Sequence, residues 1–327
     1  PLLTSQIGLS GLFGLTSLAA ILAIGLLWVV PTPQRLIKQT PVSYRQQLTT
    51  VLKIADLNRL HFSIFVLHLL MTAMFVLLPM QLITQLDLPI AQHGWLYLPL
   101  LLLGFILAIP AIIVAESKQQ MQRIFMFGVG LIAVSMLVLT VFDQRAWGLV
   151  LGVALFFIAF NLIEALLPSW LAKRAPVASR ATAMGLNASS QFLGAFAGGV
   201  LGGQLLAHAS IQTAWAVLTV LCVLWLLSAR RLSSPPYLSS LAVRLPLNLS
   251  QAADTAAVPA QAALSPRESS HSSQEQLWMS RLLAVQGVED VVILLEQKIA
   301  YLKIDKRQLG EAGRHELSQI LEYPVAL

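Results

Sequence analysis

The sequence predicts an all-α transmembrane helical bundle followed by a small α+β domain. Three observations lead to this fold class. Hydrophobic residues make up 57% of the 327 residues and charged residues only 11%, whereas a soluble domain carries about 25% charged residues. Long apolar segments follow one another up to Arg231, and beyond it the composition becomes that of a water-soluble protein. A soluble globule of this composition would expose large apolar patches to water, and a bilayer removes that problem.

Seven segments are long enough to cross a membrane, since a spanning helix needs about 20 mostly apolar residues. Within lipid the backbone must satisfy its own hydrogen bonds, so each segment is expected to be a helix. The expected spans are residues 7–30, 60–84, 94–115, 123–142, 147–171, 182–207 and 212–229.

Basic residues alternate between successive loops. Loop 31–59 carries five basic residues and one acid, the next loop, 85–93, carries Asp87 and no Lys or Arg, and the alternation continues through every later crossing. Because cytoplasmic loops concentrate Lys and Arg, this pattern places residue 1 outside and the C-terminal region in the cytoplasm. The sequence shows no basic stripe interleaved with aromatic residues, so no nucleic acid partner is expected.

Residues 232–327 are predicted to form a separate cytoplasmic domain, with residues 1–231 as the transmembrane region. A segment rich in Ala, Ser, Pro and Gln, residues 250–275, is read as a flexible insertion. The expected strands are 238–245, 288–294, 299–304 and a short last strand 323–327, and the expected helices are 275–285 and 310–321. In chain order the first five elements give βαββα, and the last strand, where it forms, closes them as βαββαβ, the arrangement of a ferredoxin-like domain.

No cofactor is expected. Metal-binding domains of the ferredoxin-like type place two cysteines between the first strand and the first helix, and residues 246–274 contain none. Because a soft-metal site needs thiolates, metal delivery by this domain is not predicted. The chain also contains no GxxxxGK[ST] loop for ATP and no catalytic constellation, so we do not expect an enzyme.

Three stretches of the sequence carry a family resemblance. They are AFNLIEALLPSW at 159–170, AMGLNASSQFLGAFAGGVLGG at 183–203 and VQGVEDVVILLEQKIAYLKID at 285–305. Together they resemble a drug-efflux branch of the major facilitator superfamily that carries a C-terminal ferredoxin-like domain. The resemblance implies that the seven spans are helices six to twelve of a twelve-helix transporter, with 31–59 as its central cytoplasmic loop. It also implies an N-terminal helical half, missing here, as a partner.

The function implied by this resemblance is secondary active transport. We expect a multi-pass protein of a bacterial inner membrane that exports small drug-like or apolar compounds by proton-coupled antiport. Its partners would be the lipid bilayer, a small-molecule substrate and protons. Two alternatives remain open: a transporter that takes up a metabolite, and a non-transporting membrane sensor whose cytoplasmic domain is the output module.

Glu164 is the only acid well inside an expected span. A charge at the centre of a bilayer is costly, so such an acid usually faces the protein interior or a cavity. Asn161, three residues earlier, lies on the same helical face. We interpret Glu164 and Asn161 as candidates for proton coupling or for binding a cationic substrate. The alternative is a structural acid, hydrogen-bonded to Asn161 or to an arginine of the missing half, that fixes helix packing.

Other polar side chains in the spans are weaker candidates. His68 lies in the middle of a span, and because histidine titrates near neutral pH it suits proton exchange. A neutral, hydrogen-bonded His68 is the alternative. Asn187 and Gln191 are one turn apart, and they either bind a polar part of a substrate or form hydrogen bonds across helices.

Gly194, Gly198 and Gly202 have GxxxG spacing. Small residues at this spacing allow two helices to approach closely. We expect this face to pack against a helix of the missing half, either as static packing or as a sliding surface during transport.

Overall fold

The computed structural model describes residues 2–29, 43–176, 179–245, 277–294 and 299–321. The chain divides into two compact units, Pro1–Pro235 and Pro236–Leu327, and each is described by itself. The boundary lies four residues beyond the expected one. Residues just after the last helix remain bound to the first unit: Gln122 donates a hydrogen bond of 2.6 Å to the Leu232 carbonyl, and Ser234 donates one of 2.7 Å to Gln122.

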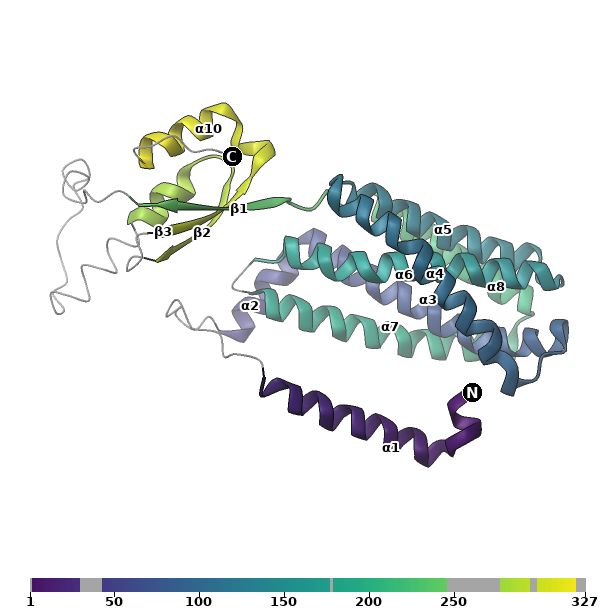
Figure 1. Cartoon of the computed structure of the whole chain (residues 1–327). Helices are drawn as coiled ribbons and strands as arrows, with labels where there is room; N and C mark the ends of the chain where they lie inside the picture. Colours follow the sequence, from purple (N-terminus) through teal and green to yellow (C-terminus); the bar gives the residue numbers. More distant parts are fainter. Residues whose placement is uncertain (1, 30–42, 177–178, 246–276, 295–298, 322–327) are drawn as a thin grey trace. The chain divides into compact units, whose positions relative to one another are not determined.

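The described residues of the first unit are helical, with short connections (Figure 1). Helices are found at all seven expected spans, although residue 30 of the first lies outside the described residues. The helices are α1 (Leu2–Leu27), α2 (Tyr44–Lys53), α3 (Ala55–Leu86), the 3-10 helix η1 (Ile90–Gln92), α4 (His93–Ser117), α5 (Met121–Val141), α6 (Ala146–Arg174), α7 (Arg180–His208) and α8 (Ile211–Ala229).

Six of the helical segments in the described residues are long and apolar enough to cross a membrane. They are Gln6–Leu27, Ala55–Leu86, Ile90–Ser117, Met121–Val141, Ala146–Arg174 and Ile211–Ala229. The seventh expected span, residues 182–207, lies in α7, which has 29 residues and is long enough. It is not among the six, because its Gly, Ser, Asn and Gln residues lower its hydropathy.

The expected loop 31–59 is partly helical. Residues 30–42 lie outside the described residues, but Tyr44–Lys53 form α2 and α3 begins at Ala55. Helix α3 therefore begins five residues before the expected span 60–84, and the role of this segment as a central cytoplasmic loop stays a prediction. A short amphipathic helix such as α2, in which only Val51 is buried, is easily taken for a loop because its mean hydropathy is low.

Helices α3 and α7 lie side by side (Figure 1), and glycines set how closely they approach. A Cβ added to Gly194 or Gly198 would lie 2.1 or 2.2 Å from the carbonyl oxygens of Phe65 and Leu69. A Cβ added to Gly202, the third glycine of this GxxxG series (the glycine ladder), would lie 3.0 Å from the Cα of Ala73. The four-residue spacing of the glycines thus matches the spacing of backbone groups along α3. The expectation that this face packs against the missing half was wrong, because α3 occupies it.

The described part of the second unit contains a three-stranded antiparallel sheet in the order β1-β3-β2. Residues 277–284 form a helix, and α10 bends at Gly310, which has φ 48°. Leu282, Leu302 and Leu317 are fully buried in one core between the helices and the sheet. The bounds are β1 (Leu238–Arg244), β2 (Val288–Leu294), β3 (Ile299–Asp305) and α10 (Lys306–Leu321).

The described elements of the second unit follow the expected chain order. A strand, a helix, two strands and a helix occur at the predicted places, with ends that differ by a few residues. The expected insertion 250–275 and the expected last strand 323–327 lie outside the described residues. The domain is therefore a small α+β unit, and the complete ferredoxin-like motif stays a prediction.

Candidate functional site

Three of the predicted site residues lie together inside the first unit. His68 comes from α3, Glu164 from α6 and Gln191 from α7. The Nε2 atom of His68 is 2.8 Å from Nε2 of Gln191 and 3.8 Å from Oε2 of Glu164. The glycine contacts between α3 and α7 bring the first pair within hydrogen-bonding distance, because a larger residue on that face would hold the two helices apart.

The hydrogen bonds of His68 are those of a neutral ring. Its Nδ1 atom is 3.2 Å from the carbonyl oxygen of Ile64, which can only accept, so Nδ1 carries the proton. The Nε2 atom of the neutral ring then accepts a hydrogen bond from the amide of Gln191. Gln191 therefore bonds across helices, which is one of the two readings expected for it.

Glu164 has an oxygen without a hydrogen-bond donor among the residues that the structure describes. Its side chain is 35% exposed, yet Oε2 is buried and has no hydrogen-bond partner among the described residues. Asn161 does not supply one, because its Nδ2 atom donates a hydrogen bond of 2.8 Å to the carbonyl oxygen of Phe157. An unpartnered buried carboxylate oxygen is costly. Within the described part of the chain, this oxygen therefore lacks the hydrogen bond that an ionised carboxylate needs.

Asn187 lies apart from this group, nearer the beginning of α3. Its side chain faces His61, and the two residues are 7% and 6% exposed. The ring nitrogens of His61 and the Oδ1 atom of Asn187 have no hydrogen-bond partner of standard geometry among the described residues. Nor does the described part of the chain bring three His, Cys, Asp or Glu side chains together as metal ligands.

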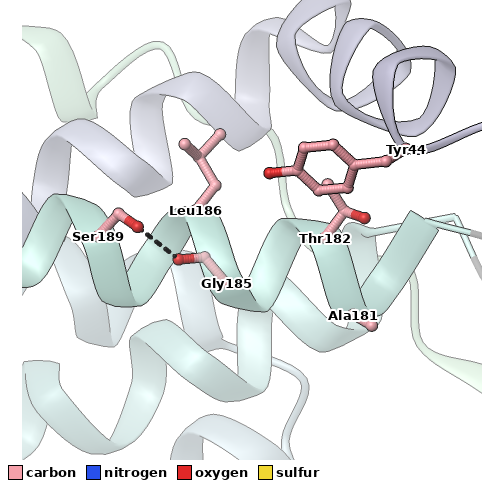
Figure 2. Close-up of a pocket in the computed structure, with 6 residues that line it drawn as sticks. All are labelled: Tyr44, Ala181, Thr182, Gly185, Leu186 and Ser189. Carbon is pink, nitrogen blue, oxygen red and sulfur yellow. Dashed lines mark hydrogen bonds between the residues drawn. The ribbon is translucent and has the colours of Figure 1, made fainter.

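A pocket of about 330 Å³ lies between α2 and α7 (Figure 2). None of the predicted site residues lines it. Two of its hydroxyl groups already donate hydrogen bonds, from Ser189 to the Gly185 carbonyl at 3.1 Å and from Thr182 to Gln47 at 2.7 Å. These two hydroxyl groups can therefore accept a hydrogen bond from a ligand but not donate one while these contacts last. Its lining residues are Tyr44, Ala181, Thr182, Gly185, Leu186 and Ser189.

A cluster of charged side chains, here called the Asp56 cluster, joins α3, α6 and the segment after α8. It consists of Asp56, Arg59, Arg174 and Ser233. The carboxylate of Asp56 accepts hydrogen bonds of 2.8 Å from both arginines and a short one from the serine. Arg59 also donates a hydrogen bond of 3.1 Å to the carbonyl oxygen of Arg231.

The Asp56 cluster was not predicted from the sequence. Its arginines indicated only the orientation of the loops, and Asp56 was one acid in a basic loop. A second acid is also bound by a basic residue of another helix. Glu116, at the end of α4, accepts a short hydrogen bond from Lys173 at the end of α6 and one of 2.7 Å from Ser169. An acid among basic residues at a helix end does not by itself predict an ion pair between helices, because the sequence does not reveal which helix supplies the partner.

Comparison with known proteins confirms the family resemblance. The model of the Major Facilitator Superfamily matches residues 1–198 and 122–287. The inner membrane transport protein YajR of Escherichia coli K12 is 36% identical over 98% of this chain and 65% of its own length. Two uncharacterized transporters of Buchnera aphidicola, from the subspecies Baizongia pistaciae and Acyrthosiphon pisum, are each 25% identical over 70% and 61% of this chain.

The chain spans only part of these relatives: 65% of the first, and 59% and 51% of the two Buchnera proteins. The activity, substrates and partners of a whole transporter are therefore matters for proposal. The family model, in contrast, covers most of the chain, including the helices that carry His68, Glu164 and Gln191. This chain belongs to the major facilitator superfamily.

Proposed function

We propose that the protein is a proton-coupled secondary transporter of a bacterial inner membrane that exports small, largely apolar compounds. The observation that carries this proposal is the approach of Glu164 to His68 beside Gln191. Family membership supports transport. An acid with one oxygen that has no hydrogen-bond donor among the described residues faces a neutral histidine inside the bundle. This supports protons as the coupling ion, because both groups can exchange a proton.

Protonation of this site would change a contact between two helices. In the described residues His68 is the titratable side chain within ion-pair distance of Glu164, and Gln191 is an uncharged neighbour. A proton on His68 Nε2 turns that atom from an acceptor into a donor. The Gln191 amide must then rotate to present its oxygen, and the new N–H group can approach Glu164. Proton uptake is thereby linked to the packing of α3 against α7.

The proposal is tested with the full-length transporter in liposomes that contain a pH-sensitive dye. Cationic, neutral and anionic organic compounds are added outside, and proton flux is recorded with and without a pH gradient. We expect flux with wild-type protein and only background flux with Glu164→Gln and His68→Gln, since both lose a proton-accepting group. His208→Gln, at the exposed end of α7, is the matched control and should retain full flux. Full proton-driven flux by Glu164→Gln over a pH series would contradict the proposal.

The orientation proposed for the bundle places the Asp56 cluster and the second unit in the cytoplasm. Its support is the distribution of charge over the helix ends: Arg59, Arg174 and Arg231 lie at one end of their helices, whereas Asp87 follows the opposite end of α3. Lys and Arg concentrate on the cytoplasmic side of membrane proteins.

Single-cysteine labelling in intact cells checks this orientation. The natural cysteine, Cys222, is fully buried and should give little background. We expect Asp87→Cys to react with a membrane-impermeant maleimide from outside, and Ser117→Cys to react only after the cells are opened. Both positions are exposed at helix ends, so reactivity reports the compartment. Equal reactivity of the two variants in intact cells would refute the proposed topology.

We also propose that the second unit is a ferredoxin-like domain with a regulatory or interaction role. The antiparallel order β1-β3-β2 supports this fold. In the described residues β1 pairs only with β3, so its other edge is where the strand expected at 323–327 would add. A solution structure that places this segment away from β1 would exclude the complete motif.

A further inference from the structure

His61 and Asn187 form a second pair of a histidine from α3 and an amide from α7. The first pair is His68 with Gln191, whose side-chain nitrogens are 2.8 Å apart. The glycine ladder of α7 meets successive residues of α3 in chain order, so the two helices run in the same direction. The pair of His61 and Asn187 therefore lies nearer the beginning of both helices than the candidate site does.

The ring of His61 is not held in one tautomer, in contrast to the ring of His68. The carbonyl oxygen of Ile64, 3.2 Å from Nδ1 of His68, fixes the proton of that ring. Neither ring nitrogen of His61 has a hydrogen-bond partner of standard geometry among the described residues. A histidine with both nitrogens unengaged can accept a proton at one nitrogen and release a proton from the other.

The buried polar atoms of this second pair need hydrogen-bonding partners. Both ring nitrogens of His61 and the Oδ1 atom of Asn187 are buried, and the described part of the chain supplies no partner of standard geometry. Buried polar groups of this kind are usually satisfied by ordered water, which needs about two to four polar contacts. We therefore expect ordered water beside His61 and Asn187.

His61 lies between the beginning of α3 and the candidate site. His68 is seven residues, or two turns, further along the same face of α3. This separation corresponds to about 10 Å along the helix axis at 1.5 Å per residue. Asn187 precedes Gln191 by one turn on α7. The two pairs therefore form a line of polar side chains between α3 and α7, which leads from the end that carries the Asp56 cluster towards Glu164.

The charged groups at this end of the bundle do not form an ion pair with His61. Asp56 is bound to Arg59 and Arg174, and within the described part of the chain no carboxylate is paired with His61. A lasting positive charge on this ring has no counter-ion, so a proton passes through it more readily than it stays. The charged residues at this end of α3 and of the helices packed against it are Arg45, Lys53, Asp56, Arg59, Lys173, Arg174, Arg180 and Arg230.

We propose that His61, positioned by Asn187, relays protons between the helix ends that carry the Asp56 cluster and the pair of Glu164 and His68. One ring nitrogen takes a proton from water on the side of the helix ends. The other nitrogen gives up its own proton, which passes through water to Oε2 of Glu164, and the reverse sequence carries a proton out. Water then returns the ring to its first tautomer, so His61 gains and loses no net proton. The inference rests on the proposed function and adds the route by which protons reach its site.

The test measures proton flux by the full-length transporter in liposomes, with the same pH-sensitive dye and the same cationic, neutral and anionic compounds. We expect His61→Gln to lower the rate at least about tenfold, because a positioned proton-transfer group typically contributes about 100-fold or more. Glutamine keeps hydrogen-bonding groups at this position but does not take up a proton. The remaining flux should show a larger solvent isotope effect in heavy water than wild type, since proton transfer then limits the rate. Asn187→Ala should change both quantities in the same direction.

Two further measurements separate a relay from a structural role. Exchange of a radiolabelled transported compound across the liposome membrane at equal pH requires no net proton transfer, so His61→Gln should exchange it at the wild-type rate. His61→Leu removes buried groups that lack partners in the described residues, so it should melt at or above the wild-type temperature and yet lose proton flux. His208→Gln, at the exposed end of α7, is the matched control and should keep the wild-type flux and isotope effect.

Two results would overturn the inference alone. The first is wild-type proton flux in His61→Gln without a larger isotope effect. The second is an equal loss of proton flux and of exchange at equal pH, which would indicate a structural role. Both leave the proposed function intact as long as Glu164→Gln abolishes proton flux. Flux that persists in Glu164→Gln over a pH series would instead refute the proposed function, and with it the relay, which would have no acceptor to serve.

Discussion

Replacing Gly198 with alanine is expected to separate α3 from α7 and to lower the stability of the helical bundle. The new Cβ would lie 2.2 Å from the carbonyl oxygen of Leu69. That oxygen belongs to a helix backbone and cannot move aside by changing a rotamer, so the helices must shift apart. Overpacking of this kind costs about 1–3 kcal/mol, which corresponds to a fall of about 5 °C in the melting temperature. A Gly194→Ala, Gly198→Ala double variant should show a larger fall in melting temperature.

The matched control is Gly203→Ala in the same helix. A Cβ at Gly203 meets nothing within 4 Å, so this variant should melt at or above the wild-type temperature. Thermal unfolding of the purified full-length protein, followed by the loss of monodisperse material, measures both variants. Gly198→Ala should also reduce proton flux, because a wider gap between α3 and α7 lengthens the contact between His68 and Gln191. Equal melting temperatures for the Gly198 and Gly203 variants would show that this contact is not tight.

The helices were the most predictable part of the fold. Long apolar segments in a chain with few charges leave little choice of structure, because only helices satisfy the backbone in lipid at this segment length. The glycine ladder of α7 was visible as well, but its partner was not. Spacing identifies the face of a helix that packs closely, whereas the identity of the helix on the other side depends on tertiary arrangement. The assignment of that face to the missing half failed for this reason.

The site was predictable only in part. Glu164, His68 and Gln191 each stood out as polar residues in apolar segments, yet nothing in the sequence indicates that Gln191 and Glu164 meet at the same ring nitrogen. Asp56 was missed for a different reason. Its partners lie 118 and 177 residues away at Arg174 and Ser233, and the surrounding segment was taken for a loop.

Replacing Asp56 with alanine is expected to loosen three helix ends at once. The variant leaves Arg59 and Arg174 without the carboxylate that each contacts at 2.8 Å. Breaking a fully buried ion pair costs about 3–5 kcal/mol. Here the arginine side chains are 31% and 33% exposed, so water compensates part of the loss. We expect a cost of about 2 kcal/mol, between the values for surface and buried pairs.

Asp87→Asn provides the control for the loss of an acid at a helix end. Asp87 is exposed and has φ 49°, a conformation that asparagine also tolerates, so this change should leave the melting temperature unaltered. Comparable destabilisation by Asp56→Ala and Asp87→Asn would indicate a general effect of charge. A variant with the charges exchanged, Asp56→Arg with Arg174→Asp, should recover part of the loss only if the pair itself contributes to stability.

The place in the structure where Asp56→Ala lowers stability is as informative as the size of the destabilisation. The Asp56 cluster holds the segment directly after α8 through Ser233 and the Arg231 carbonyl, and this segment is the covalent link to the second unit. Hydrogen exchange should therefore accelerate in Asp56→Ala at 230–234 and at the first turn of α3, while the glycine contacts of α3 with α7 remain protected. Faster exchange along all of α3 would instead mean that Asp56 supports the whole helix. Only the local result makes the Asp56 cluster an anchor for the link between the two units.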